Sequence, residues 1–422
     1  MLLLKLLKDV NLMREKFSGY TVGVGVILYM FFTYGFANVI SVAMGVLPQY
    51  YNVDISSVVL TCSASSIAAF ATSAFVHRFI KKFTPRGTLV VGAFCWLAYC
   101  WFIGFSNNII FMYMAQIVSG FALGCCMHAS CSIIIMNWFI EKRGRMISLC
   151  MSAGTFGGSL MIYISGVLLP ILGVSRFFIY SGIVLCAVCL FCAIVLVKND
   201  PAAVGQKALG WEKAQNIQHD GDIKNNTASS PISSQKNLFS SKKFWMFAIG
   251  VVFAMSSISY IGLYTTTVLP MHGIDFSKAS ALFSILTLGG ALFTIISGFI
   301  VEKMGVKALL ILSCIGGFFA NMAMILWIGN QSAIFILILF TGYLFAVPLN
   351  SISNQLAGPV FGSRSSEAAA KLTAFSYFGG VAISPAVSKL IPYIGYTGVY
   401  TIGAVFSILV LILFFSAMKV KD

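Results

Sequence analysis

Charged side chains are scarce in this sequence. Only 9% of the 422 residues are Asp, Glu, Lys or Arg, whereas 59% are hydrophobic and the mean hydropathy is +0.93. A soluble globular domain carries about 25% charged residues. The deficit excludes an ordinary soluble domain and indicates that lipid surrounds most of the chain.

Acidic residues are the rarest charged group, with 12 Asp and Glu against 27 Lys and Arg. All of them stand in predicted loops, tails or helix ends, so the apolar segments offer no carboxylate pair for acid–base catalysis. The sequence also contains no GxxxxGK[ST] motif and no HExxH motif. We therefore expect no enzyme activity, no ATP-driven step within this chain and no cofactor. A membrane enzyme or a non-transporting sensor is the least favoured alternative.

Metal ligands are not arranged in a recognisable pattern. The eleven cysteines all fall inside apolar runs, and no cluster of histidines accompanies them. Free Cys behaves as a small buried hydrophobe in such surroundings. We therefore predict free thiols rather than a metal site or a set of disulfides.

Twelve apolar segments approach or exceed the roughly 20 residues that a membrane-spanning helix needs. They predict an all-α membrane protein with twelve transmembrane helices. The segments occupy residues 20–47, 55–79, 88–105, 110–136, 146–170, 175–197, 244–270, 276–301, 306–328, 332–357, 372–391 and 396–418.

The positions of the cations predict the orientation in the membrane, because Lys and Arg concentrate in short cytoplasmic loops. If the N-terminus is inside, 24 of the 27 cations lie on the inner side, and only Arg176, Lys278 and Lys389 lie outside. We predict a multi-pass protein of the cell membrane with both termini cytoplasmic. The basic excess then reflects topology and attraction to anionic lipid, not a nucleic-acid partner.

One long polar segment, residues 199–243, divides the spans into six and six. It is rich in Asn, Ser and Gln and has no apolar period, so it is expected to be a cytoplasmic linker. The predicted domains are an N-terminal six-helix bundle at 1–198, the linker at 199–243 and a C-terminal six-helix bundle at 244–422.

The two halves repeat each other at an offset near 222 residues. TFGGSLMIYISGVLLPILG at 155–173 returns as YFGGVAISPAVSKLIPYIG at 377–395, and VLPQYYNVDIS at 46–56 returns as VLPMHGIDFS at 268–277. Such repetition indicates two parallel structural repeats of six helices. Parallel repeats are a transporter design in which the binding site lies between the halves near mid-membrane.

A loop in the second half resembles a signature of the major facilitator superfamily, G-x-x-x-D/E-x-x-G-x-K/R, with Gly298, Glu302, Gly305 and Lys307 at its positions. The first-half copy, HRFIKKFTPR at 77–86, retains only the cation, Arg86. In that family the loop is an inner-side gate, so the resemblance implies a gating role for these five residues.

A second stretch, NWFIEKRGRMISLCMSAGTFGGSL at 137–160, resembles the oxalate/formate-antiporter-like and monocarboxylate-porter-like branch of the superfamily. Together the two resemblances imply the twelve-helix fold, alternating access and small organic anions as substrates. Thr294 and Phe378 stand where members of that branch often carry an Arg and a Lys.

His128 is the only ionisable side chain near the middle of a predicted span other than Cys and Tyr. Ionisable groups within a membrane are expensive and point to function. His128 is therefore either a substrate contact or proton carrier, whose pKa near 6.5 lets small shifts switch its charge, or a neutral histidine that is hydrogen-bonded within the bundle.

The repeat offset pairs His128 with Asn350, Asn38 with Tyr260 and Thr155 with Tyr377, and every member of these pairs is polar. The alternative for any single Tyr or Asn is a helix–helix hydrogen bond. With their i, i+4 neighbours on the same helix faces, the predicted substrate-binding residues are Tyr34, Asn38, His128, Thr155, Tyr260, Tyr264, Asn350, Asn354 and Tyr377.

The leading function is a secondary active or facilitative transporter that moves a small organic solute, with an organic acid as the first candidate. The alternative is an exporter of a neutral or aromatic amphiphile, because 14% of residues are aromatic. The expected partners are the solute, a proton or counter-solute, and membrane lipid. A monomer is expected, and neither a metal nor nucleic acid is.

Overall fold

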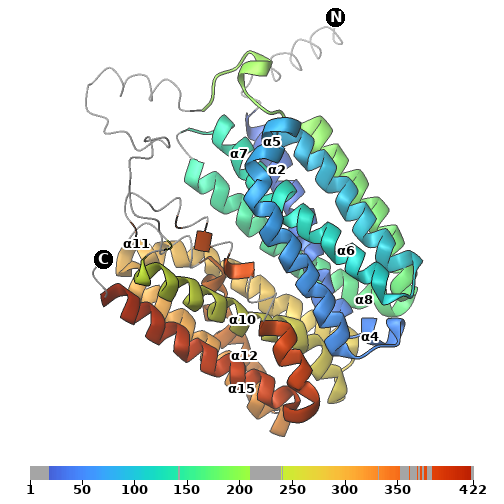
Figure 1. Cartoon of the computed structure of the whole chain (residues 1–422), viewed down its shortest axis with the longest axis vertical. Coiled ribbons are helices and arrows are strands. Elements are labelled where there is room, and N and C mark those ends of the chain that lie inside the picture. Colours follow the sequence, from blue (N-terminus) through green and yellow to red (C-terminus); the bar gives the residue numbers. More distant parts are fainter. Residues whose placement is uncertain are drawn as a thin grey trace, which may run out of the picture.

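The chain is predominantly helical in the part that the structure, a computed structural model, describes. That part comprises residues 19–140, 143–209, 239, 241–330, 332–351, 361, 368, 371–372, 375–377 and 383–419. Figure 1 shows two groups of helices, one built from the segments before the linker and one from the segments after it. Among the described residues, the one β-type contact is an isolated parallel bridge between Phe139 and Leu209.

The first group contains seven α-helices and two π-helical turns. They are α2 (Gly19–Ala37), α3 (Val39–Ala43), α4 (Leu47–Tyr51), α5 (Ile55–Phe105), α6 (Ile109–Phe121), η1 (Ala122–Met127), α7 (His128–Trp138), α8 (Arg143–Phe191) and η2 (Cys192–Leu196). A 3₁₀ turn, η3 (Ala202–Val204), follows in the linker. The second group contains α10 (Lys242–Met271), α11 (Phe276–Asn330), α12 (Ala333–Ala346), the 3₁₀ turn η5 (Val347–Ser351) and α15 (Ser384–Lys419).

Polar caps and apolar composition explain where several of these helices lie. The Asn108 side chain accepts a 2.9 Å hydrogen bond from the Ile110 N–H at the start of α6, and Ser241 accepts one from the Phe244 N–H at the start of α10. Such caps satisfy N–H groups that have no partner inside the helix. The interiors are apolar because backbone groups in lipid must be satisfied within the helix itself.

Nine helices in the described part are long and apolar enough to cross a membrane, and a shorter apolar helix occupies Ala333–Leu349. Two of the nine are double. Leu149–Leu196 contains 48 residues and bends at Gly173, and Ala386–Lys419 bends at Gly395. These segments fit the twelve predicted spans, although residues 373–374 and 378–382 of the eleventh, 372–391, lie outside the described part.

The sharp turns of the two halves repeat each other in backbone conformation. Gly173 (φ 73°, ψ 163°) corresponds to Gly395 (φ 63°, ψ −179°) at the 222-residue offset. At an offset of 221, Thr84 (φ 61°, ψ 155°) corresponds to Gly305 (φ 82°, ψ 165°). The sequence repeat is thus also a repeat of unusual positive-φ turns, which only Gly adopts without strain.

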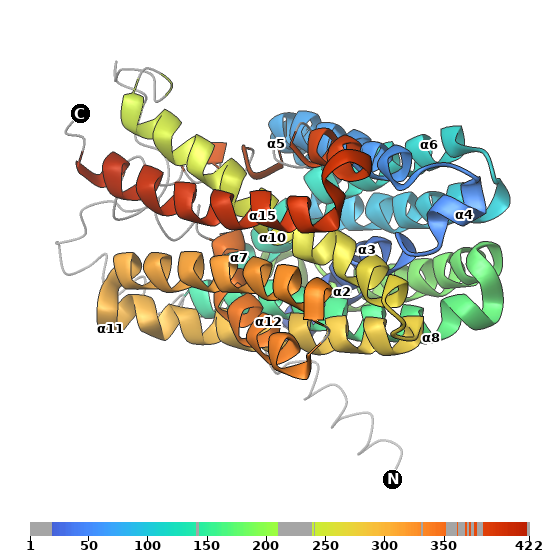
Figure 2. The ribbon, with the colours of Figure 1, turned by 90° about the horizontal axis from the view of Figure 1, so that it is seen from below.

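The linker defines one end of the molecule, which we call the linker end, and the opposite end is the far end. The start of α2 lies at the linker end, where Gly23 packs beside Phe139. Figure 1 shows the two helix groups diverging toward the linker end and meeting toward the far end, near α4 and the bend of α8. Figure 2 shows the molecule from below as two layers, each with helices of both groups: α5 and α6 lie in one layer with α10 and α15, and α2 and α8 lie in the other with α11 and α12.

Candidate functional site

A cavity of about 290 Å³ lies between the two halves. Segments before and after the linker both contribute to it: Asn38, α3 and α5 on one side, and α10, α11 and α12 on the other. Its lining residues are Asn38, Ser41, Val59, Cys62, Ser66, Ile258, Ser259, Gly262, Leu263, Phe283, Thr287 and Tyr343.

None of these lining side chains carries a full charge. The polar ones are hydroxyls, one amide and one thiol, and the rest are aliphatic or aromatic. Uncharged hydroxyl and amide groups donate and accept hydrogen bonds without requiring a counter-ion. The arrangement can therefore hold a small solute that has both polar and apolar surface.

At Asn38 the hydrogen-bond ladder of the first span has a local break, although the residue keeps helical φ (−78°) and ψ (−12°). Helix α2 ends at Ala37 and α3 begins at Val39, and the Asn38 side chain donates a 2.8 Å hydrogen bond to the Tyr34 carbonyl. Gly158 of α8 lies directly behind the amide, and a Cβ there would come within 2.9 Å of the Asn38 side-chain nitrogen. Breaks in a spanning helix are tolerated where they line a cavity.

The Gly pair of the repeated FGG motif lets the first and fifth spans touch through their backbones. A Cβ at Gly157 would overlap the carbonyl oxygen of Phe31, and a Cβ at Gly35 would lie 2.7 Å from the Gly157 carbonyl carbon. Small residues at helix contacts permit this close approach in membranes. The pair therefore positions Tyr34 and Asn38, which face Gly154 and Gly158 across the contact.

His128 lies beside this group but is not among the cavity-lining residues. It follows the π-helical turn η1, and its half-buried ring makes an edge contact with Tyr34, with ring centroids 5.5 Å apart. π-helical turns inside α-helices occur frequently at functional sites.

Tyr260 and Tyr264 do not line the cavity. Both are fully buried on the opposite face of α10, where Tyr260 packs near Phe406 and Tyr264 near Tyr396 of α15. The cavity face of α10 carries Ser259 instead. An offset of 221 rather than 222 pairs Ser259 with Asn38, and one residue of slip rotates a helix face by about 100°.

The other predicted binding residues have different positions. Thr155 is half-buried on α8, and its carbonyl accepts a 3.3 Å hydrogen bond from the Ser159 hydroxyl. Tyr377 is half-buried in the eleventh predicted span. Asn350 belongs to the turn η5, but its side chain, like the whole of Asn354, lies outside the described residues.

Sequence reasoning missed the small polar lining residues Ser41, Ser66, Ser259 and Thr287, together with Tyr343. Ser and Thr are common in spanning helices, where most of them bond to a carbonyl of their own helix. Only the 221-residue register with Asn38 could have singled out Ser259.

The gating-loop residues occupy equivalent bends in the two halves. Gly305 forms the bend in α11, and Lys307 is exposed just after it. Gly298 and Glu302 lie in the same helix, but their side-chain surroundings are outside the described part.

Arg86 bonds to backbone rather than to an acid. Its guanidinium donates hydrogen bonds of 2.9 and 2.6 Å to the carbonyls of Ala193 and Ile194, and its N–H donates one to the Asn199 side chain. These carbonyls belong to the last turn of the sixth span, where cations are favoured. In the first half, the loop cation therefore ties the third span to the sixth and to the start of the linker.

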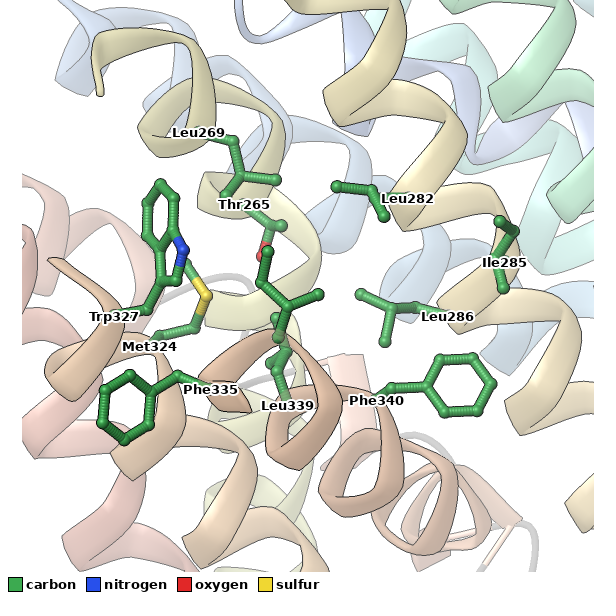
Figure 3. Close-up of a pocket in the computed structure, with 11 residues that line it drawn as sticks. Thr265, Leu269, Leu282, Ile285, Leu286, Met324, Trp327, Phe335, Leu339 and Phe340 are labelled. Carbon is green, nitrogen blue, oxygen red and sulfur yellow. The ribbon is translucent and has the colours of Figure 1, made fainter. Parts of the chain in front are cut away.

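A second, smaller pocket of about 40 Å³ lies within the second half, among α10, α11 and α12. Figure 3 shows that its wall is almost wholly aliphatic and aromatic, with Thr265 as the one polar side chain. A water molecule occupies about 30 Å³ in the liquid. This pocket is therefore too small for an organic solute, and the cavity between the halves is the candidate site.

Comparisons with known proteins agree with this architecture. The family model described as Major Facilitator Superfamily matches residues 26–360. No curated protein matches the sequence.

Several solved structures share the fold. A D-xylose-proton symporter has a TM-score of 0.72 and 16% identity over 96% of this chain and 98% of its own. The nucleoside transporter NupG has a TM-score of 0.72 and 15% identity over 95% and 100%. The E. coli xylose transporter XylE, partially occluded and inward open, has a TM-score of 0.71 and 16% identity over 96% and 100%. These matches confirm the predicted all-helical membrane fold.

Proposed function

Because the chain belongs to the major facilitator superfamily of membrane transporters, we propose that it carries a small uncharged organic solute through the cavity between its halves. The observation that carries this proposal is the lining itself, which joins hydroxyl and amide groups to apolar walls without a charged side chain. An ion held there would lose hydration without gaining a counter-charge, which is costly in a low-dielectric interior.

The cavity volume favours a small solute. At about 290 Å³ it lies just below the range of about 300–1,000 Å³ that typical ligand pockets occupy. Because the lining comes from both halves, a bound solute would bridge them. Rocking of one half against the other would then expose the same site to each side of the membrane in turn.

An organic acid, which the branch resemblance favours, is the second candidate. Its support is His128, whose ring contacts Tyr34 beside the cavity and could supply a positive charge when protonated. The two candidates differ in one property. Uptake of a neutral solute would not require His128 to ionise, whereas uptake of an anion would depend on pH and on this side chain.

Ligand-induced thermal stabilisation of the purified full chain separates these classes, since a ligand that binds only the folded state raises stability. The panel would contain neutral polyols, sugars and nucleosides, then mono- and dicarboxylates, then aromatic amphiphiles. We expect stabilisation by a neutral hydroxyl- or amide-bearing compound. Stabilisation by carboxylates alone would overturn the neutral class, and stabilisation by amphiphiles alone would favour the export alternative.

Two variants test whether the cavity is the site. Asn38→Ala and Ser259→Ala each remove a lining polar group, and we expect each to weaken stabilisation by the compound found, by about 5- to 10-fold in affinity. Thr401→Val is the matched control, because Thr401 is exposed on α15 and its hydroxyl bonds only to the Thr397 carbonyl. Unchanged binding in both cavity variants would place the site elsewhere.

A further inference from the structure

Hydroxyl groups of the second half bond to the backbone of the first half along one line of contact. Thr266 donates a 2.6 Å hydrogen bond to the Ser41 carbonyl, and Ser277 donates one of 3.1 Å to the Gly166 carbonyl. Ser284 donates a 2.6 Å bond to the Ser159 carbonyl. We call this line the far-end seam, because it runs from mid-helix toward the loops opposite the linker.

Close backbone contact accompanies these bonds. A Cβ at Gly166 would overlap the Ser280 side chain, and a Cβ at Gly45 would lie 2.7 Å from the Phe276 ring. The donors of these three bonds all stand on α10 or α11, and the acceptors are all carbonyls of α3 or α8. In this contact the second half therefore supplies the hydrogen-bond donors and the first half the acceptors, and the helices are also tightly packed.

We infer that the far-end seam is a reversible lock of hydroxyls on carbonyls that sets how often the far end opens, with Thr287 linking it to the cavity. This inference rests on the proposed function, which requires the two halves to separate at each end in turn. A lock of this kind must hold in lipid without leaving orphaned polar groups when it breaks.

The donors Thr266 and Ser284 meet that requirement, because each hydroxyl can fall back on a carbonyl three or four residues earlier in its own helix. Ser277 is the second residue of α11 and stands beside the loop that precedes it. Thr287 already shows both options. Its hydroxyl oxygen lies 3.0 Å from the Ser159 hydroxyl oxygen across the seam and 2.9 Å from the Ser284 carbonyl oxygen within its own helix, and its single proton can serve either acceptor.

On the acceptor side, the Ser159 carbonyl lies inside α8 and keeps its helical environment. The Gly166 carbonyl has no donor four residues on, because residue 170 is Pro, and the Gly45 N–H bonds to the Val42 carbonyl rather than to that of Ser41. Opening the seam therefore exchanges the bonds to the Ser41 and Gly166 carbonyls for hydration by water that enters the open far end, and such an exchange has a modest net cost per bond.

Two residues belong to both the seam and the cavity. Thr287 and Ser41 line the cavity, while the Thr287 hydroxyl and the Ser41 carbonyl take part in the seam. A solute that bonds to the Thr287 hydroxyl competes with Ser159 for it. Occupancy of the cavity by solute is thus coupled to the hydrogen bonds of the far-end seam through a single side chain, that of Thr287.

Hydrogen exchange of the full chain in lipid nanodiscs tests the lock without any solute, because amide exchange scales with the population of the open form even when that form is rare. The informative peptides are 41–52 and 268–278 at the far end. Peptides from 242–252, at the linker end of α10, serve as an internal reference. The variants are Ser277→Ala, Ser284→Ala, their combination, Thr287→Val, and Gly166→Ala, which adds bulk instead of removing a bond.

We expect each single hydroxyl variant to raise far-end exchange about threefold and the Ser277/Ser284 pair about tenfold, since one interhelical hydrogen bond in a membrane has a modest worth. Gly166→Ala should also raise it, while the reference peptides stay unchanged. Thr341→Val is the matched control, because Thr341 is exposed on α12 and bonds only within its helix.

Unchanged far-end exchange in the paired variant would overturn the lock, and so would an equal rise in Thr341→Val. Far-end exchange in Thr287→Val equal to that of the wild type would overturn the link to the cavity. Failure of the proposed function has a different signature, because it would abolish solute stabilisation while leaving these exchange rates as predicted.

Discussion

Thr84 adopts a backbone conformation that its side chain disfavours. With φ 61° and ψ 155° it stands where the second half has Gly305. A β-branched residue in this region costs roughly 1–3 kcal/mol. Its hydroxyl recovers part of the cost by accepting a 3.3 Å hydrogen bond from the Gly87 N–H. The first-half loop thus has Thr84 where the family signature has Gly, but its backbone keeps the positive-φ bend that the Gly forms in the second half.

We predict that Thr84→Gly stabilises the protein by about 1 kcal/mol, because relief of strain exceeds the roughly 0.5–1 kcal/mol entropic cost of Gly. The expected rise in melting temperature is about 2 °C, measured by scanning fluorimetry in detergent. Thr84→Ala is the control, since it keeps the strain and loses the hydroxyl. An equal or lower melting temperature for Thr84→Gly would show that the bend is not strained.

Arg86 holds the last turn of the sixth span by its fixed fork of donors. We predict that Arg86→Gln lowers stability by roughly 1–3 kcal/mol, because charge-assisted bonds to the Ala193 and Ile194 carbonyls are lost. The stability of Arg86→Lys should lie between those of the wild type and Arg86→Gln, since an ammonium keeps the charge but cannot reproduce the two parallel donors of the guanidinium. Lys82→Gln is the matched control, with an exposed amine 5.7 Å from the Phe83 ring. Equal melting temperatures for Arg86→Gln and Lys82→Gln would contradict this role.

At the scale of helices, the two glycines at the contact between the first and fifth spans have different neighbours, so one substitution tests packing and the other tests solute binding. Gly157 faces the Phe31 backbone, which cannot move aside, whereas Gly158 faces the flexible end of the Asn38 side chain. We predict that Gly157→Ala lowers stability by about 2–3 kcal/mol through overpacking and reduces the yield of monodisperse protein in size-exclusion chromatography.

Gly158→Ala should leave the melting temperature nearly unchanged but weaken solute binding, because it displaces the amide that lines the cavity. Gly87→Ala is the control for both variants, since a Cβ there meets only ordinary contacts of 3.4 Å or more. The prediction fails if Gly157→Ala is as stable as Gly87→Ala, or if Gly158→Ala binds as the wild type does.

The same helices show what the sequence could and could not predict. Apolar length, Lys and Arg placement and the repeated FGG motif predict the spans and the architecture, because these signals extend over tens of residues. The cavity depends on which helix face turns inward. A one-residue shift of the repeat offset, from 222 to 221, puts Ser259 rather than Tyr260 opposite Asn38 on that face. An offset determined from scattered Gly and Pro residues is not accurate to one residue, so the sequence could not distinguish the two.

For the molecule as a whole, the equivalent bends support two repeats joined by the linker. Asn52 (φ 54°) and Gly273 (φ 87°) add a further positive-φ pair at an offset of 221. The Asn137 side chain donates a 2.8 Å hydrogen bond to the Asp200 carboxylate, and the Trp138 indole donates one to the Lys198 carbonyl. These bonds attach the first residues after the sixth span to the end of the fourth, so the linker leaves the first half from a fixed point.

The orientation of these repeats in the membrane follows from charge, and it decides which way the described conformation faces. Because 24 of the 27 cations fall in segments assigned from the sequence to the inner side, the positive-inside rule predicts that the linker side is cytoplasmic. The far-end seam would then close the outer side, and the described conformation would be inward-facing.

We predict that a protease-cleavable tag inserted in the linker between Asn225 and Asn226 is protected in intact cells, and that one at Asn107, in the exposed far-end loop, is cut. Inside-out vesicles should reverse both results, which controls for tags that are merely inaccessible. Cutting of the linker tag in intact cells would invert the topology and, with it, the side to which the cavity opens. The seam would then close the cytoplasmic side, and the described state would be the one that meets solute from outside.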